Sequence, residues 1–317
     1  MKIVILDAYA CNPGDLDWNR LAAMGELAAY DRTPPDQVIP RCAEAEIVFT
    51  NKTHLGRREL TALPKLRFLG LLSTGTNAID VQAATELGIP VSNIPAYGTP
   101  SVAQSVFALL LDLTNQTARH SQAVHDGVWT RCRDFCFTLS PIIELSGLTL
   151  GLVGFGAIGQ AVARIGRAFG MDILVHTRAV PTEGMGGILF VDLPELLSRS
   201  DVVSLHCPLN DKTKELINRE SIAQMKSGAM LINTGRGGLV NEADLAEALN
   251  SGRLGGAGLD VLGTEPPKAD NPLLTAARCV ITPHVAWASK AARARLIDIA
   301  SDNLRAFLDG APINLVV

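Results

Sequence analysis

The sequence contains no apolar run as long as a membrane-spanning helix needs, which is about 18 residues. It also lacks a strong excess of one charge, because 28 basic and 32 acidic residues leave a formal net charge of -4. Hydrophobic residues make up 47% of the chain and charged residues 19%, a balance that does not fit intrinsic disorder. We therefore expect a soluble globular protein that binds neither membranes nor nucleic acid.

Paired cysteines of the kind that bind zinc or form disulfide frameworks are absent as well. The six cysteines are scattered along the chain without a C-x-x-C pair. The first residues, MKIVILD, turn acidic too early for a signal peptide. These absences predict reduced thiols, no bound metal and a cytoplasmic location.

What the chain does contain is an alternation of short apolar runs and helical patterns. Its 317 residues are enough for two domains, each with its own core. In the first part, strands and helices are predicted in turn at 3–6, 16–27, 47–49 and 66–72. The prolines and glycine of NIPAYGTP then indicate a domain boundary near 95–100.

A long helix is predicted directly after this boundary, from Ser101 to about Gly127, with Ser101 as its N-cap. The next segment, 128–146, has three aromatic residues, no clear period and more apolar character than an ordinary surface loop. We interpret it as a dimer arm in a homodimeric protein. Packing of this segment within its own domain is the alternative.

From residue 148 onward the alternation resumes and predicts a second parallel sheet. Its strands are expected at 148–153, 172–176, 202–206, 230–233, 258–261 and 280–282, and its helices at 158–169, 193–200, 220–225 and 242–249. The last helix, 289–308, is too far from this order and is predicted to return to the first domain. The predicted fold is therefore α/β with two doubly wound parallel sheets and a functional cleft between them. They are a flavodoxin-like substrate domain, 1–98 and 286–317, and a Rossmann dinucleotide-binding domain, 99–285, with the dimer arm at about 117–146.

The clearest motif is GFGAIG, which follows the apolar run that ends at Val153. Gly154, Gly156 and Gly159 have the G-x-G-x-x-G spacing that a dinucleotide site requires. The first glycine permits a tight turn, the second lets a pyrophosphate approach the backbone, and the third lets helix and strand pack closely. The N-terminus of the following helix, at Ala157 and Ile158, is then expected to face the phosphates.

The residues after the second strand of this unit bear on the choice of cofactor. An acidic side chain about 20 residues past the glycines would bind the ribose hydroxyls of NAD, but this chain has Thr177 and Arg178 there. A neutral residue followed by a guanidinium suits a ribose 2′-phosphate better. We therefore predict an NAD(P) cofactor with NADPH favoured. A solvated surface arginine is the alternative interpretation of Arg178.

Three further motifs follow predicted strands, where an open α/β sheet binds its ligands: INTGRGG, LDVLGTEPP and ITPHVAW. Together with the glycine motif, LHCPL and SVAQ, they resemble the D-isomer-specific 2-hydroxyacid dehydrogenase family over nearly the whole chain. Within that family the sequence looks most like the glycerate dehydrogenase or hydroxypyruvate reductase branch.

The resemblance implies roles for individual residues. Arg236 would bind the substrate carboxylate and polarise its carbonyl, His284 would be the acid and base, and Glu265 would hold the imidazole and favour its charged form. The other implied positions are Cys207 and Pro208 along the nicotinamide, Thr234 and Asp260 near its carboxamide, the amides of Thr74 and Gly75 at the substrate carboxylate, and Trp287 in the wall of the substrate pocket.

The function that the resemblance implies is reduction of a small 2-oxo acid, hydroxypyruvate or glyoxylate, to the D-2-hydroxy acid by hydride transfer from NAD(P)H. Transcriptional corepressors share this fold and can keep the same three residues. A nucleotide-sensing binding protein is therefore the alternative, although the chain lacks long disordered flanks that would recruit partners.

Overall fold

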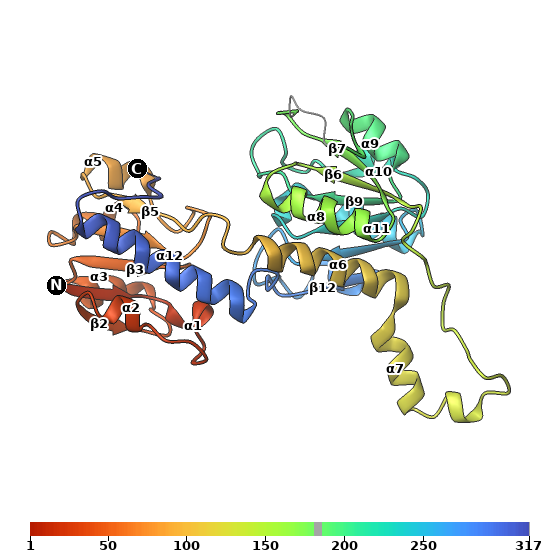
Figure 1. Ribbon diagram of the computed structural model, residues 1–317, viewed down its shortest axis with the longest axis horizontal. Coiled ribbons are helices and arrows are strands. Elements are labelled where there is room, and N and C mark those ends of the chain that lie inside the picture. Colours follow the sequence, from red (N-terminus) through yellow and green to blue (C-terminus); the bar gives the residue numbers. More distant parts are fainter. Residues whose placement is uncertain (181–185, 317) are drawn as a thin grey trace. The chain divides into compact units, whose positions relative to one another are not determined.

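The computed structural model describes residues 1–180 and 186–316, and the chain forms two compact units. Unit 1 comprises Met1–Gly98 and Trp287–Val317, and unit 2 comprises Thr99–Ala286. Each unit is built on one parallel sheet with helices on both faces, so the predicted α/β class is confirmed (Figure 1). Among the described helices, none has the length and apolar character needed to cross a membrane.

The sheet of unit 1 has the strand order β2-β1-β3-β4-β5, and all its pairs are parallel. This is the flavodoxin-like order, whose topological switch point lies between β1 and β3. The strands are β1 (Lys2–Ile5), β2 (Glu26–Ala29), β3 (Ile47–Thr50), β4 (Phe68–Leu71) and β5 (Val91–Ser92).

Alternate residues of these strands enter two separate cores, as the period of two in a strand requires. One core includes α1 (Ala8–Cys11), α12 (Lys290–Leu308) and Leu21 of α2 (Asn19–Ala22); the other includes α3 (Val38–Cys42), α4 (Arg57–Thr61) and α5 (Val81–Glu86). Helix α12 reaches this sheet from the end of the chain, and its Phe307 ring lies 4.8 Å from that of Phe68. The last helix, which the sequence predicts to return to the first domain, thus packs on the sheet of unit 1.

The prediction of one helix over 16–27 is wrong. Only the short α2 forms there, and the chain continues into β2, which pairs with β1. Strand β2 is an edge strand of glutamate, leucine and alanine, residues whose local preference favours helix. The pairing with β1 overrides this local preference. The approach to β1 is close: a Cβ at Gly25, just before β2, would lie 2.5 Å from the Met1 carbonyl oxygen.

The sheet of unit 2 has the order β12-β11-β10-β9-β6-β7-β8, again entirely parallel. This is the Rossmann order with one additional strand, and its switch point lies between β6 and β9. The strands are β6 (Thr149–Val153), β7 (Asp172–His176), β8 (Ile188–Phe190), β9 (Val202–Leu205), β10 (Met230–Asn233), β11 (Gly256–Leu259) and β12 (Cys279–Ile281).

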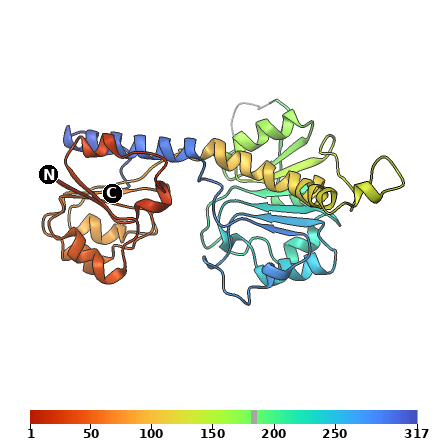
Figure 2. The same cartoon turned by 90° about the horizontal axis from the view of Figure 1, so that it is seen from below.

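Two groups of helices cover the two faces of this sheet (Figure 2). One face packs against α6 (Thr99–Asn115) and α8 (Ala157–Ala168), and the other against α9 (Leu193–Arg199), α10 (Arg219–Gln224) and α11 (Glu242–Asn250). With both faces buried, the strands are nearly continuous apolar runs, which is why six of the seven were predicted within two residues. Strand β8 was missed.

The prediction of a single helix from Ser101 to Gly127 is wrong as well. Helix α6 begins at Thr99, so Ser101 lies inside its first turn, and it ends at Asn115. Gln116 has a φ of 47°, a left-handed conformation that stops the helix, and α7 (Thr117–His125) begins after it.

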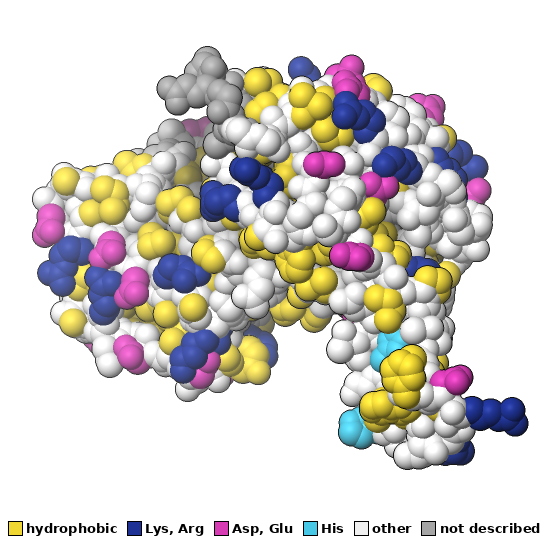
Figure 3. Space-filling view, turned by 45° about the vertical axis from the view of Figure 1, so that its right-hand side comes forward, with side chains coloured by type: hydrophobic (Ala, Val, Ile, Leu, Met, Phe, Trp, Pro, Cys, Tyr) yellow, Lys and Arg dark blue, Asp and Glu magenta, His cyan; other side chains and the backbone are white. Residues whose placement is uncertain are grey.

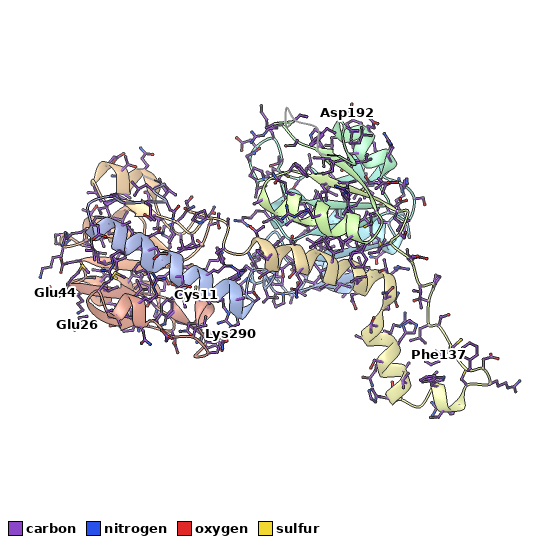
Figure 4. The ribbon with its side chains drawn as sticks, viewed as in Figure 1. Cys11, Glu26, Glu44, Phe137, Asp192 and Lys290 are labelled. Carbon is purple, nitrogen blue, oxygen red and sulfur yellow. The ribbon has the colours of Figure 1, made fainter. Side chains whose placement is uncertain are left out.

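Helix α7 and the segment after it form an arm that extends from unit 2 (Figure 1). His120 connects the two sides of the arm: its Nδ1 lies 3.0 Å from the Gln116 oxygen, and its Nε2 accepts a hydrogen bond from the Leu139 amide at 3.1 Å. The Phe137 ring lies between the two sides of the arm, 6.3 Å from the His120 ring (Figure 4).

Apolar side chains of the arm remain uncovered. Phe135 is 89% exposed, Ile142 57% and Trp129 51%, and hydrophobic side chains gather on the arm (Figure 3). Packing within the same domain, the alternative considered for this segment, therefore does not account for these three residues.

Candidate active site

The glycine turn lies at the switch point of the unit 2 sheet, between the end of β6 and the start of α8. Gly154 has a φ of 99°, and a Cβ there would lie 2.6 Å from the His206 carbonyl carbon. A Cβ at Gly159 would lie 2.5 Å from the Gly154 oxygen. Both positions therefore require glycine, whereas a Cβ at Gly156 would meet no atom within 4 Å. The turn thus leaves open space at the N-terminus of the 12-residue α8, which begins at Ala157 and Ile158, and this space fits a dinucleotide phosphate.

Strand β7 ends at His176, and Thr177 and Arg178 follow it at the same edge of the sheet. Thr177 is half-buried and Arg178 is exposed. Within the described part of the chain, the Arg178 guanidinium forms no ion pair or hydrogen bond. Its charge is therefore available to a ligand, but its exposure equally fits a solvated arginine.

The neighbouring strand end, after β9, is electrically neutral. The His206 amide donates to the Val153 oxygen at 2.7 Å, which brings this strand end beneath the glycine turn. The His206 Nε2 lies 2.9 Å from the Ser204 hydroxyl, and burial lowers the pKa of the ring from 6.5 to about 4. Burial also raises the pKa of the Cys207 thiol. Both side chains are consequently uncharged near neutral pH. The next residue, Pro208, is uncharged as well.

The turn after β10 presents Arg236 to solvent. The Asn233 side chain closes the turn, donating to the Arg236 oxygen at 2.9 Å and accepting from the Gly235 amide at 3.0 Å. The Arg236 side chain is exposed, and one of its N–H groups donates to the Gly235 oxygen at 2.8 Å. The planar guanidinium keeps further donors, which match a carboxylate.

Thr234, in the same turn, has a buried hydroxyl without a hydrogen-bond partner among the described residues. Buried polar groups in proteins are nearly always paired, so an orphaned one at a strand end indicates a bound group. The uncommitted Thr234 hydroxyl and the open glycine turn both fit a dinucleotide on this edge of unit 2.

Glu265 and His284 form an ion-pair geometry at the ends of β11 and β12. The His284 Nδ1 lies 2.6 Å from the Glu265 Oε2, and the second carboxylate oxygen accepts from the Leu262 amide at 3.1 Å. Because a carboxylate only accepts hydrogen bonds, the Nδ1 must carry a proton. This leaves the Nε2 of the ring as the nitrogen that can exchange a proton with a ligand. The two side chains are 30% and 36% exposed, so they remain accessible.

The other predicted site residues, Thr74, Gly75 and Trp287, belong to unit 1. After β4, the Thr74 hydroxyl donates to the Ile94 oxygen at 2.6 Å, and the Ser73 hydroxyl donates to the Gly75 oxygen at 2.7 Å. The turn is thereby fixed through its carbonyl and hydroxyl groups. Trp287 is half-buried, and its ring meets that of Tyr97 edge-on at 6.1 Å.

Sequence reasoning missed three residues that shape the unit 2 edge: Asn233, Ser204 and Thr282. Asn233 bonds to the Arg236 backbone, Thr282 bonds to the Asp260 carboxylate, and Ser204 bonds to His206, which precedes the site residue Cys207. Asn233 and Thr282 stand inside the motifs INTGRGG and ITPHVAW, so attention to the polar residue before each functional one could have found them.

The class that this fold and site define is the dinucleotide-dependent oxidoreductases, in which the sheet binds the cofactor and a nearby side chain handles the proton. Residues 107–286 match the family model described as "D-isomer specific 2-hydroxyacid dehydrogenase, NAD binding domain".

Individual proteins agree with this match. The chain is 50% identical to a hydroxypyruvate reductase of Blautia hydrogenotrophica, over 100% of this chain and 99% of that protein. It is 39% identical to a glycerate dehydrogenase of Methylorubrum extorquens, over 99% and 98% of the two chains. A solved NADPH-dependent glyoxylate/hydroxypyruvate reductase from Sinorhizobium meliloti, in complex with citrate, superposes with a TM-score of 0.86 at 31% identity, over 100% of this chain and 97% of that one. The chain belongs to the D-isomer specific 2-hydroxyacid dehydrogenase family, and it is an NAD(P)-dependent oxidoreductase.

Proposed function

We propose that the protein reduces hydroxypyruvate or glyoxylate to the corresponding D-2-hydroxy acid or its achiral equivalent. The observation that carries this proposal is the Glu265–His284 pair, 2.6 Å apart on the sheet edge that also bears Arg236 and the glycine turn. The two relatives named above, a hydroxypyruvate reductase and a glycerate dehydrogenase, support the same substrate class.

The residues of this edge have complementary tasks in such a reduction. The bound nicotinamide cofactor supplies a hydride to the carbonyl carbon. The guanidinium of Arg236 binds the substrate carboxylate and stabilises the negative charge that develops on the carbonyl oxygen. The Nε2 of His284 donates a proton to that oxygen, and Glu265 stabilises the imidazolium beforehand. In the oxidative direction the neutral imidazole accepts the same proton.

The remaining site residues keep the roles proposed for them from the sequence. Thr74 and Gly75 bind the substrate carboxylate through backbone amides, and Trp287 lines the substrate pocket. The cofactor contacts are assigned to Gly154, Gly156, Ala157, Ile158 and Gly159 for the phosphates, Thr177 and Arg178 for the adenosine ribose, and Cys207, Pro208, Thr234 and Asp260 for the nicotinamide.

NADPH is the proposed preferred cofactor. Thr177 offers no carboxylate that would repel a 2′-phosphate, and the exposed Arg178 adjoins it. The relative from Sinorhizobium meliloti is described as NADPH-dependent, which agrees with this preference.

A substrate panel with both cofactors tests the proposed activity. Hydroxypyruvate, glyoxylate, pyruvate and a bulky 2-oxo acid are each supplied with NADPH or NADH, and oxidation of the cofactor is followed. We expect the first two acids to give the highest kcat/KM. The corepressor alternative predicts tight cofactor binding without turnover of any acid, and that outcome would overturn the proposal.

The protein is further proposed to act in the cytoplasm as a homodimer held by the arm, with a second copy covering the exposed Phe135 and Ile142. Light scattering after size exclusion measures the mass of wild type, Phe135→Ser and Ile142→Ser. A dimeric wild type and monomeric arm variants are expected. Leu87→Ser, which changes a 42% exposed residue of unit 1, serves as the control and should stay dimeric.

A further inference from the structure

The carboxylate of Asp260 is almost completely buried, which is unusual for a group that carries a charge. Asp260 directly follows β11 and is 2% exposed. Its Oδ1 accepts hydrogen bonds from the Thr282 hydroxyl at 2.6 Å and the Val285 amide at 2.9 Å, and its Oδ2 accepts one from the Ala286 amide at 2.9 Å. A buried carboxylate persists only when such donors replace its hydration. All three donors come from the short segment 282–286.

His284 lies in the middle of this segment in an unusual backbone conformation. Its φ is 55°, in the left-handed region that residues with a Cβ seldom adopt. Its amide donates to the backbone oxygens of Asp260, at 2.8 Å, and of Thr282, at 2.9 Å. A strained conformation of this kind remains populated only where the surroundings over-determine it. Here the Asp260 side chain binds the chain on both sides of His284.

We propose that Asp260 and Thr282 are positioning residues for His284, which hold its backbone in the left-handed conformation so that the ring meets Glu265. This inference rests on the proposed function, in which His284 is the acid and base. It assigns to Asp260 a task in addition to the cofactor contact proposed above, and it assigns a task to Thr282.

The geometry explains why a carboxylate is needed. Three donors converge on Asp260, and the two oxygens of a carboxylate can accept from all of them. An asparagine amide would turn two N–H donors toward at least one of these donors, leaving buried groups unpaired. The 282–286 segment would then relax from its strained conformation, and the Nδ1 of His284 would move out of reach of Glu265.

The first experiment compares Asp260→Asn, Thr282→Val and Thr282→Ser with wild type. Thr282→Val removes the hydroxyl and keeps the shape, whereas Thr282→Ser keeps the hydroxyl. We expect kcat to fall about tenfold to hundredfold in Asp260→Asn and about threefold to tenfold in Thr282→Val, because small displacements of a catalytic group are costly. Thr282→Ser should retain most of the wild-type kcat. The alkaline limb of the kcat profile should move toward acid in the two impaired variants only.

Asp201→Asn is the matched control. Asp201 also accepts a backbone amide, that of Thr149, at 2.9 Å, but it lies at the opposite edge of the same sheet. Its replacement should leave kcat and the pH profile unchanged. If Asp260→Asn does not fold, the two Thr282 variants decide the matter, and a Thr282→Val enzyme with wild-type kcat and pH profile would overturn the proposal.

A double-mutant cycle separates positioning of His284 from a direct contact with the cofactor. In the Glu265→Gln background the partner of the imidazole is already altered, so Thr282→Val should cost less in kcat than it does in wild type. Additive losses, or a Kd for the reduced cofactor that rises in Thr282→Val as much as kcat falls, would show that Thr282 acts on the cofactor and not through His284.

An NMR titration of the His284 ring keeps this inference distinguishable from the proposed function. Its signals are assigned by comparison with His284→Asn. If the wild type reduced no 2-oxo acid, the proposed function would fail, but the Asp260→Asn ring should still titrate at lower pH than the wild-type ring. Identical titrations would contradict the positioning role whatever the enzyme reduces.

Discussion

Unit 1 and unit 2 each have an aspartate that fixes a loop at the carboxyl end of the sheet, but only the loop in unit 2 carries a residue proposed for acid and base chemistry. In unit 1, Asp7 follows β1 and accepts three successive backbone amides, those of Asn51, Lys52 and Thr53, at 2.8, 2.5 and 2.7 Å. In unit 2, Asp260 follows β11 and accepts two amides and a hydroxyl. Each carboxylate thus fixes the loop that follows the adjacent strand of its sheet.

The difference lies in what each fixed loop presents. The loop held by Asp260 contains His284, paired with Glu265, and the neighbouring turn presents Arg236. Beside Asp7, by contrast, Asn51 donates to the Leu72 oxygen and Thr50 donates to the Thr53 oxygen, so both side chains bond within unit 1. In the proposed reaction the unit 2 edge would therefore supply the charged groups, whereas the bonds of Asn51 and Thr50 serve to fold the loop of unit 1 itself.

The largest expected effect is that of Arg236→Ala. A carboxylate and a developing oxyanion lose their charged partner, which costs about 3 kcal/mol or more, or about a hundredfold in kcat/KM. Arg236→Lys should restore little, because an ammonium lacks the planar fork. The control is Arg199→Ala, which removes an exposed arginine paired with Glu195 and should leave kcat/KM unchanged. If Arg236→Ala kept substantial activity on every 2-oxo acid, Arg236 would not be the group of the unit 2 edge that binds the substrate carboxylate.

His206 gives the next effect, on stability instead of rate. Its pKa falls from 6.5 to about 4 on folding because the ring is buried. Below pH 6.5 the His206 ring is therefore protonated in the unfolded chain, whereas in the folded protein it stays neutral down to about pH 4. The stability that the neutral ring contributes is present above this window and is lost as the pH falls through it. The loss is at most about 3 kcal/mol, because His206 as a whole residue is only half-buried and solvent screens part of the effect.

Urea unfolding from about pH 7.5 to about pH 4.5 measures this loss. His206→Asn should lose stability less steeply than wild type as the pH falls. His54→Asn, which replaces an exposed histidine, should follow the wild-type curve. Parallel curves for wild type and His206→Asn would mean that the ring of His206 is already solvated in the folded protein.

How far the sequence anticipates this structure depends on how local each signal is. Strands such as β7 and β10 are buried on both faces, so their apolar runs predict them to the residue. The edge strands β2 and β8 are short and half-exposed, and they form only because a neighbouring strand offers its hydrogen bonds. The break at Gln116 has no glycine or proline to announce it.

The site divides in the same way. The spacing of Gly154, Gly156 and Gly159 predicts the turn because every step of it is local. The task of Asp260 could not be predicted, because its partners are backbone amides 25 and 26 residues further along the chain. The motifs indicate which residues matter, whereas the hydrogen bonds between distant loops indicate what they do.

Replacement of Asp7 tests the comparison from the side of unit 1. Asp7→Asn removes an acceptor from a group of three amides and should lower the free energy of unfolding by about 1–3 kcal/mol. It should leave the alkaline limb of the kcat profile in place, since no titratable catalytic group depends on the loop it fixes. A limb that moves as far as in Asp260→Asn would show that both edges carry the acid and base chemistry.

The smallest expected effect concerns the adenosine end of the unit 2 edge, where the charge of Arg178 has no described partner. One charge-assisted hydrogen bond to a 2′-phosphate contributes about 1.5–3 kcal/mol, and with a single exposed arginine the lower end applies. We therefore expect about a tenfold preference for NADPH over NADH in KM. Thr177→Asp should reverse this order, because it places an acceptor against the ribose hydroxyls and a negative charge against the phosphate.

The measurement is KM for both cofactors in wild type, Thr177→Asp and Arg178→Ala, with Arg199→Ala as the control. Arg178→Ala should raise KM for NADPH about tenfold and leave KM for NADH unchanged, because only NADPH carries the phosphate. A loss for both cofactors would place Arg178 against the adenine or the pyrophosphate instead. A wild type that prefers NADH, together with an Arg178→Ala variant of unaltered KM for NADPH, would show that the guanidinium is solvated and that cofactor choice rests with Thr177 and its neighbours.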